Sequence, residues 1–184
     1  MKQFVKIFAL MMALALVIGI LAACGDKKGG DTTGTGEGTA AETEKAGGEA
    51  KGETQTWGRY TVLIPDGYVL KGGDVFDEEN TKAFNINNKD SSLTYFMFNT
   101  YDEDSCKSSI DTTKDMNEGA SDVSVVYNGV TWTGVAYESI GIACFSMYAD
   151  FGNGDFVLLS AAGNAYDSDT TSAILSSLVL APAE

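Results

Sequence analysis

Three segments in the second half of the chain are apolar on both faces of a β-strand, and this pattern restricts the fold more than any other feature. They are residues 93–101, 142–151 and 155–163, where large apolar side chains occupy odd and even positions alike. Successive side chains of a strand point to opposite faces of the sheet, so both faces of this sheet have to be covered. Because a glycine-rich turn, Gly152-Asn153-Gly154, separates the last two segments, we expect them to form an antiparallel hairpin.

Further strands and two helices complete the predicted order. We expect strands at 60–64, 83–87, 123–127 and 130–139, with a tight hairpin turn at Asn128-Gly129. One helix is predicted to begin near Asp102, with Cys106, Ile110 and Thr113 on one face, and the other to cover 170–180. With a helix for each face, the sequence predicts an α+β fold in which an antiparallel sheet of about six to seven strands forms an α/β/α sandwich.

Residues 1–23 have the pattern of a lipoprotein signal peptide. Lys2 and Lys6 precede an apolar run without charge, Ile7–Ala23. A short positive region followed by an apolar run and small residues is typical of an export signal. The alternative is a retained membrane-spanning anchor, for which about 17 residues is the lower limit of length.

Leu21-Ala22-Ala23-Cys24 closes the apolar run with a leucine, two small residues and a cysteine. In these four positions the chain resembles the lipobox of bacterial lipoproteins. The resemblance implies cleavage between Ala23 and Cys24 and attachment of a diacylglyceryl group to the Cys24 thiol, the only strong nucleophile nearby. Two or three acyl chains hold a protein stably on a bilayer. We therefore expect a protein anchored through lipid on Cys24 to the extracytoplasmic side of the cell membrane.

Residues 24–56 are predicted to be a disordered linker that follows the lipidated cysteine. Gly, Thr, Ala, Glu and Lys dominate this segment, which has no aromatic residue and no Val, Ile or Leu. Such a composition cannot bury enough apolar surface to offset the entropy of ordering. The composition changes at Trp57, so we expect a single folded domain over 57–184.

Three short segments of this domain carry a similarity to a known family. They are Tyr60–Tyr68 (a strand followed by Pro, Gly and an aromatic residue), the hairpin Asn128–Trp132 and the closing Ile174–Leu178. In these features residues 57–180 resemble the PsbP-like domains of photosystem subunits and of many bacterial lipoproteins. The family often has Trp where this chain has Tyr68, and it has longer loops. The resemblance implies an accessory or interaction role, and it transfers no catalytic residue.

The composition argues against catalysis and against nucleic-acid binding. The chain has no histidine, which excludes Ser-His-Asp and Cys-His catalysis and imidazole metal sites. Its net charge is −14 and Arg59 is its single arginine, whereas nucleic-acid binding requires a basic surface. We therefore expect no enzyme activity, no cofactor and no nucleic-acid partner. A carboxylate-based hydrolase acting on a cell-wall or other extracellular polymer remains the alternative, because two acids can cleave a glycosidic bond.

Acidic side chains gather at three places that are candidates for binding Ca²⁺ through oxygen ligands. The clusters are Asp74/Asp77/Glu78/Glu79, Asp102/Glu103/Asp104 and Asp167/Asp169. None has the spacing of a twelve-residue calcium loop, and the last two coincide with predicted helix starts, where carboxylates act as caps. We expect capping and no metal site, and keep a Ca²⁺-binding module as an alternative function.

Two alternative roles are open for the remaining cysteines, and two for the aromatic residues. An exported location permits a disulfide between Cys106 and Cys144, and the alternative is that both are small apolar packing residues. Five aromatic residues either belong to the core or line a groove for a peptide or a sugar, with Trp57 the most accessible. These residues are Trp57, Tyr60, Trp132, Tyr137 and Tyr148. The expected function is that of a lipoprotein whose domain binds an unidentified protein or small molecule.

Overall fold

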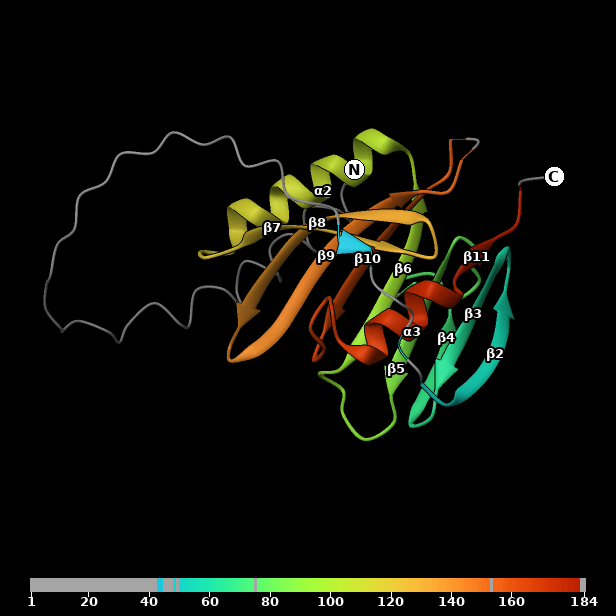
Figure 1. Cartoon of the computed structure of the whole chain (residues 1–184). Coiled ribbons are helices and arrows are strands. Elements are labelled where there is room, and N and C mark those ends of the chain that lie inside the picture. Colours follow the sequence, from blue (N-terminus) through green and yellow to red (C-terminus); the bar gives the residue numbers. More distant parts are fainter. Residues whose placement is uncertain (1–42, 45–47, 49, 75, 153, 183–184) are drawn as a thin grey trace, which may run out of the picture. The chain divides into compact units, whose positions relative to one another are not determined.

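The computed structural model describes residues 43–44, 48, 50–74, 76–152 and 154–182, which belong to one compact unit (Figure 1). The predicted signal peptide, Cys24 and most of the predicted linker lie outside the described residues. The elements of the described part are β1 (Thr43–Glu44), β2 (Gly52–Trp57), β3 (Tyr60–Pro65), β4 (Tyr68–Gly72), β5 (Ala83–Asn88), β6 (Tyr95–Tyr101), α2 (Glu103–Met116), β7 (Ser121–Tyr127), β8 (Val130–Ser139), β9 (Ile142–Asp150), β10 (Phe156–Ala162), α3 (Asp169–Ser177) and β11 (Val179–Leu180).

The large sheet has the strand order β1-β7-β8-β9-β10-β6-β5-β4. All neighbours in it are antiparallel except β1, which pairs with β7 in parallel over two residues. The predicted turn between β7 and β8 is confirmed, since Asn128 and Gly129 both have the positive φ that a two-residue hairpin requires. The predicted hairpin of β9 and β10 is confirmed as well.

A second, three-stranded sheet has the order β11-β3-β2. The strand predicted at 60–64 lies in this sheet, as β3, and not in the large one. The helix predicted to continue to residue 180 ends at Ser177, and Val179 and Leu180 then pair with β3 as β11. β4 was not predicted from the sequence. These strands form because they pair with segments far apart in the chain, and such pairing cannot be predicted from local composition.

The domain begins before the predicted boundary at Trp57, because two strands, β1 and β2, lie in or begin within the predicted linker. β2 begins at Gly52, inside the predicted linker, and pairs with β3 along its whole length. Residues 52–56 are all exposed, so β2 is held by backbone hydrogen bonds and buries almost no side chain. A strand of this kind has the composition of a linker, which is why the sequence did not reveal it.

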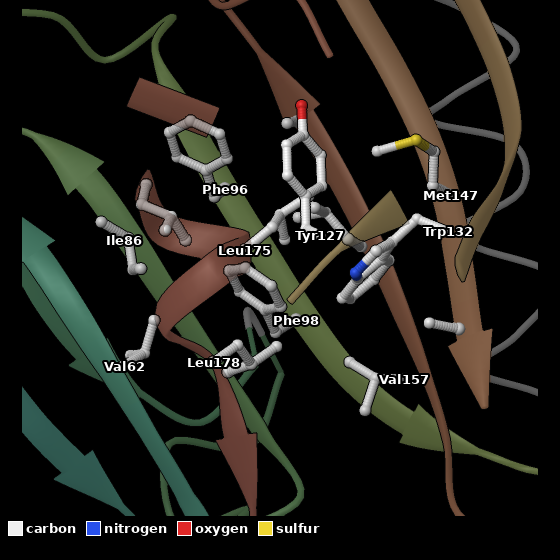
Figure 2. Close-up of a cluster of buried hydrophobic side chains, with 14 of the residues drawn as sticks. Val62, Ile86, Phe96, Phe98, Tyr127, Trp132, Met147, Val157, Leu175 and Leu178 are labelled. Atoms are coloured by element: carbon white, nitrogen blue, oxygen red, sulfur yellow. The ribbon is translucent and has the colours of Figure 1, made fainter. Parts of the chain in front are cut away.

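The two faces of the large sheet are covered by different layers. On one face, Cys106 and Ile110 of α2 pack on Val135 and Leu158, as the sequence predicted for this helix. On the other face, α3 and the three-stranded sheet enclose the main core, in which Trp132 is fully buried (Figure 2). The α+β fold with helices on both faces of an antiparallel sheet is therefore confirmed, and the second sheet is an addition to one layer.

In the described part of the chain, neither helix is long and apolar enough to cross a membrane.

Candidate functional site

The acidic loop that follows β4 is closed by its own hydrogen bonds. Asp74 Oδ1 accepts from the backbone N–H groups of Phe76 and Asp77 at 2.8 and 2.7 Å, and its Oδ2 accepts from the Asn80 side chain at 3.1 Å. Burial raises the pKa of Asp74, but these hydrogen bonds outweigh burial and the net pKa is lower than usual. The Asp74 carboxylate therefore stabilises the loop.

The other two acidic clusters begin helices, as predicted. Asp102 is the N-cap of α2, where its carboxylate accepts hydrogen bonds from the Ser105 backbone N–H at 2.8 Å and hydroxyl at 2.9 Å. At α3 the N-cap is Ser168 and not an aspartate, while Asp169 lies in the first turn. Within the ranges that the structure describes, no three acidic or cysteine side chains come together as a metal site.

Cys106 and Cys144 are both free thiols, so the disulfide reading of the sequence is wrong for this structure. Cys106 lies in the first turn of α2, which follows the end of β6. Cys144 of β9 pairs with Ala162 of β10, and Ala162 pairs on its other side with Tyr95, the first residue of β6. Cys144 is therefore level with the start of β6, whereas Cys106 follows its end. The seven residues of β6 span about 20 Å, whereas a disulfide needs Cα atoms within about 7 Å.

The five aromatic residues singled out in the sequence do not line one groove. Tyr60 and Trp132 are buried in the main core, and Trp57 packs against it. Tyr148 packs on the opposite face of the sheet, under α2, and Tyr137 points to that face as well. The alternation of side chains along each strand separates them, so most of these residues serve packing.

A pocket of about 480 Å³ lies where the two sheets meet the start of α2, and we take it as the candidate functional site. We call it the charged pocket. Its walls come from the β2–β3 turn, the start of β5, the end of β6, the N-cap of α2 and the β9–β10 loop. The lining residues are Arg59, Lys82, Thr100, Tyr101, Asp102, Gly154 and Asp155.

Arg59 is locked in place on one side of the charged pocket. Its two terminal nitrogens donate to the two carboxylate oxygens of Asp155, and its Nε donates to the Ala181 carbonyl at 2.6 Å. A guanidinium matches a carboxylate in this two-pronged geometry, which fixes both side chains. The ion pair therefore joins the β2–β3 turn, the β9–β10 loop and the end of the chain's last strand.

Tyr60, the residue after Arg59, is buried in the main core and does not line the charged pocket, but it holds two residues that do. Its hydroxyl donates to the Lys82 carbonyl at 3.2 Å and also contacts the Thr100 hydroxyl. Burial raises the pKa of Tyr60 to about 12. The phenol is thus a neutral structural group that holds the start of β5 and the end of β6 together, and it is unsuited to act as a base near neutral pH.

The two carboxylates of the charged pocket both stay ionised. The hydrogen bond from Arg59 lowers the pKa of Asp155, and the backbone hydrogen bond from Ser105 lowers that of Asp102. Glycoside hydrolysis needs one carboxyl group with a raised pKa to protonate the leaving group. With both pKa values lowered, neither carboxylate of the charged pocket has the raised pKa that this general acid needs.

The sequence drew attention to two members of this site, Arg59 and Asp102, but did not indicate that they lie together. Arg59 stands out as the single arginine of the chain, but its partner Asp155 is 96 residues away. Asp102 was singled out as a cap, and Lys82, Thr100 and Tyr101 were not singled out. Only the packing of the two sheets brings these residues together.

Comparisons with known proteins assign no family to the chain. No family model matches it, and no curated protein matches it. Among solved structures, a crystal structure of a protein from Bacteroides thetaiotaomicron VPI-5482 aligns with 71% of this chain at 12% sequence identity and a TM-score of 0.46. The aligned region spans about half of that protein, 49% of its chain.

Proposed function

We propose that the protein is a lipoprotein, anchored through Cys24 on the extracytoplasmic side of the cell membrane, whose domain binds a ligand or partner. The observation that carries this proposal is Leu21-Ala22-Ala23-Cys24 at the end of a charge-free apolar run. A cysteine in that position is the acceptor in lipid attachment, and several acyl chains suffice for stable anchoring. The segment that follows has the composition of a flexible spacer up to β2.

The character of the charged pocket supports binding as the task of the domain. Asp155 and the Ala181 carbonyl accept hydrogen bonds from three of the five N–H donors of Arg59, so its guanidinium is held rigidly. The hydroxyl of Tyr60 is buried and neutral. Such preorganised polar groups around a concave site are typical of ligand recognition. An accessory or interaction role is also what the resemblance of residues 57–180 to PsbP-like domains implies.

Metabolic labelling with a radioactive fatty acid tests the anchoring. We expect the label to enter the full-length protein in bacteria and the protein to sediment with membranes. Cys24→Ser should abolish labelling, because a hydroxyl is a far weaker nucleophile than a thiolate. Cys144→Ser is the matched control and should be labelled like the wild type.

Failure of the wild-type protein to take up label, or undiminished labelling of the Cys24→Ser variant, would rule out the anchor. A labelled protein that keeps residues 1–23 would indicate lipidation without cleavage. Mass spectrometry of the amino terminus separates these outcomes.

A further inference from the structure

We infer that the charged pocket binds a neutral, polyhydroxylated ligand of the size of a mono- or disaccharide. The inference rests on the proposed function, a binding protein, and adds the chemical class of the ligand. It is argued from the charge balance of the pocket, from its free hydrogen-bonding groups, from one exposed aromatic ring and from its size.

The charges that line the pocket cancel. Arg59 and Lys82 are cationic, Asp102 and Asp155 are anionic, and both carboxylates are ionised near neutral pH. An ionic ligand would give up its hydration without meeting a net opposite charge. A neutral ligand does not incur this cost, and it can still form hydrogen bonds to charged groups, which are the stronger kind.

The pocket has both donors and acceptors in its lining. Lys82 forms no ion pair with any residue that the structure describes, so its ammonium has donors to offer. The carboxylates of Asp102 and Asp155 each accept two hydrogen bonds within the protein, and each carboxylate has about four acceptor positions. A sugar hydroxyl donates and accepts at once, so neighbouring hydroxyls can satisfy an ammonium and a carboxylate together.

Tyr101 adds an apolar surface at the rim. It lines the pocket, yet its side chain belongs to neither core cluster and is 45% exposed. It is the last residue of β6, directly before the N-cap of α2, so its backbone is held at the junction of two elements. The ring of a tyrosine combines an apolar face with a polar hydroxyl, which suits the alternating C–H and O–H groups of a pyranose.

The size of the pocket agrees with this ligand class. Its volume of about 480 Å³ falls within the range of about 300 to 1,000 Å³ that is usual for small-molecule sites. Gly154, on the β9–β10 loop, has no heavy atom near the position of a Cβ, so this wall leaves room for a ligand to approach the backbone.

Saturation-transfer NMR on the full-length protein tests the inference. The probes are glucose, N-acetylglucosamine, cellobiose and chitobiose, with glycine and glutamate as charged comparisons. Because alkyl glycoside detergents would compete, the lipidated protein is kept in a detergent without a sugar headgroup. We expect saturation transfer to at least one sugar, and no displacement of that sugar by glycine or glutamate.

Two substitutions with matched controls assign the binding to the charged pocket. Tyr101→Ala removes the exposed ring and Lys82→Met removes the ammonium, and each should weaken sugar binding about tenfold or more. Phe76→Ala removes an exposed aromatic ring that does not line the pocket, and Lys89→Met removes a surface lysine outside it. Both controls should bind like the wild type, and unchanged thermal unfolding would show that all four variants are folded.

Absence of saturation transfer to every sugar would overturn the inference, as would sugar binding that survives both Tyr101→Ala and Lys82→Met. Preferential binding of glycine, a zwitterion, or of glutamate, an anion, would replace the uncharged ligand by an ionised one. None of these results depends on fatty-acid labelling. If the protein is labelled but binds no sugar, the lipid anchor is supported and the sugar ligand is ruled out. If it binds sugar but takes up no label, the sugar ligand is supported and the lipid anchor is ruled out.

Discussion

Ile140 has a backbone conformation that β-branched residues rarely adopt. It forms the β8–β9 turn with Gly141 and has a φ of 50°, in the left-handed region. The same two-residue turn between β7 and β8 is made by Asn128 and Gly129, where Asn128 has a φ of 51°. Asparagine tolerates this region, whereas other L-residues lose roughly 1–2 kcal/mol in it. Ile140 is also 67% exposed, so burial offsets little of this strain.

Replacing Ile140 by asparagine should stabilise the protein. We expect Ile140→Asn to raise the free energy of unfolding by about 1 kcal/mol, measured by denaturant titration, because the strain at the turn is relieved. The reverse exchange in the other hairpin, Asn128→Ile, should lower the free energy of unfolding by a similar amount. A destabilised Ile140→Asn variant would mean that the exposed isoleucine makes contacts worth more than the strain.

At the scale of elements, Trp57 connects the small sheet to the edge of the large one. It ends β2, and its indole Nε1 donates to the Asn80 carbonyl at 3.4 Å. Gly72 at the end of β4 gives the ring its place, since a Cβ atom there would overlap the indole. The edge strand β2 has almost no other buried side chain, so this contact contributes much of its packing. The absence of a side chain at Gly72 therefore allows the Trp57 ring to pack against β4, where the two sheets are in contact.

Adding a methyl group at Gly72 should disrupt this junction. We expect Gly72→Ala to lower the free energy of unfolding by about 1–3 kcal/mol, because the indole has to move away from β4. The effect should largely disappear in a Trp57→Ala background, where no ring opposes the methyl group, and denaturant titration of the four proteins gives the coupling. Equal losses in the two backgrounds would show that Gly72 acts through its backbone and not through Trp57.

For the whole molecule, the burial of a neutral thiol and a neutral phenol predicts that stability falls at alkaline pH. Burial raises the pKa of the Cys106 thiol from 9.0 to about 11 and that of the Tyr60 hydroxyl from 10.0 to about 12. A group whose pKa is raised by folding contributes stability that is complete below its unfolded pKa and is lost as pH rises through the folded value. Tyr60 lies in the main core, and Cys106 lies under α2 on the opposite face of the large sheet.

The melting temperature should therefore begin to fall above pH 9.0 and continue to fall towards pH 12. Cys106→Ala should make the fall between pH 9.0 and about 11 shallower, because alanine does not ionise. Part of the fall should remain in this variant, because burial also raises the pKa of the Cys144 thiol. Calorimetry across this range provides the measurement. A melting temperature that stays constant up to pH 12 would contradict the burial of both groups.

Part of the candidate site was accessible from the sequence. The start of α2 at Asp102 was predicted because capping is local, decided within four residues. Arg59 was conspicuous as a single arginine, but nothing local indicated Asp155 or the Ala181 carbonyl, which is 122 residues away. Lys82 directly precedes β5 and Tyr101 ends β6, and nothing local to either residue indicates that the two share a pocket. Their convergence follows from strand order alone.

Residue patterns alone were enough to predict the strands β5 to β10, the Asn128-Gly129 turn, the packed face of α2 and the need for cover on both sides of the sheet. These features follow from side-chain periodicity and turn chemistry, which act over a few residues. Three features became visible only in the folded protein: β2, β3 and β11 form a second sheet, the Trp57 ring packs on Gly72, and Arg59 pairs with Asp155 at the charged pocket. Those features depend on backbone pairing and packing between distant segments, which local composition does not encode.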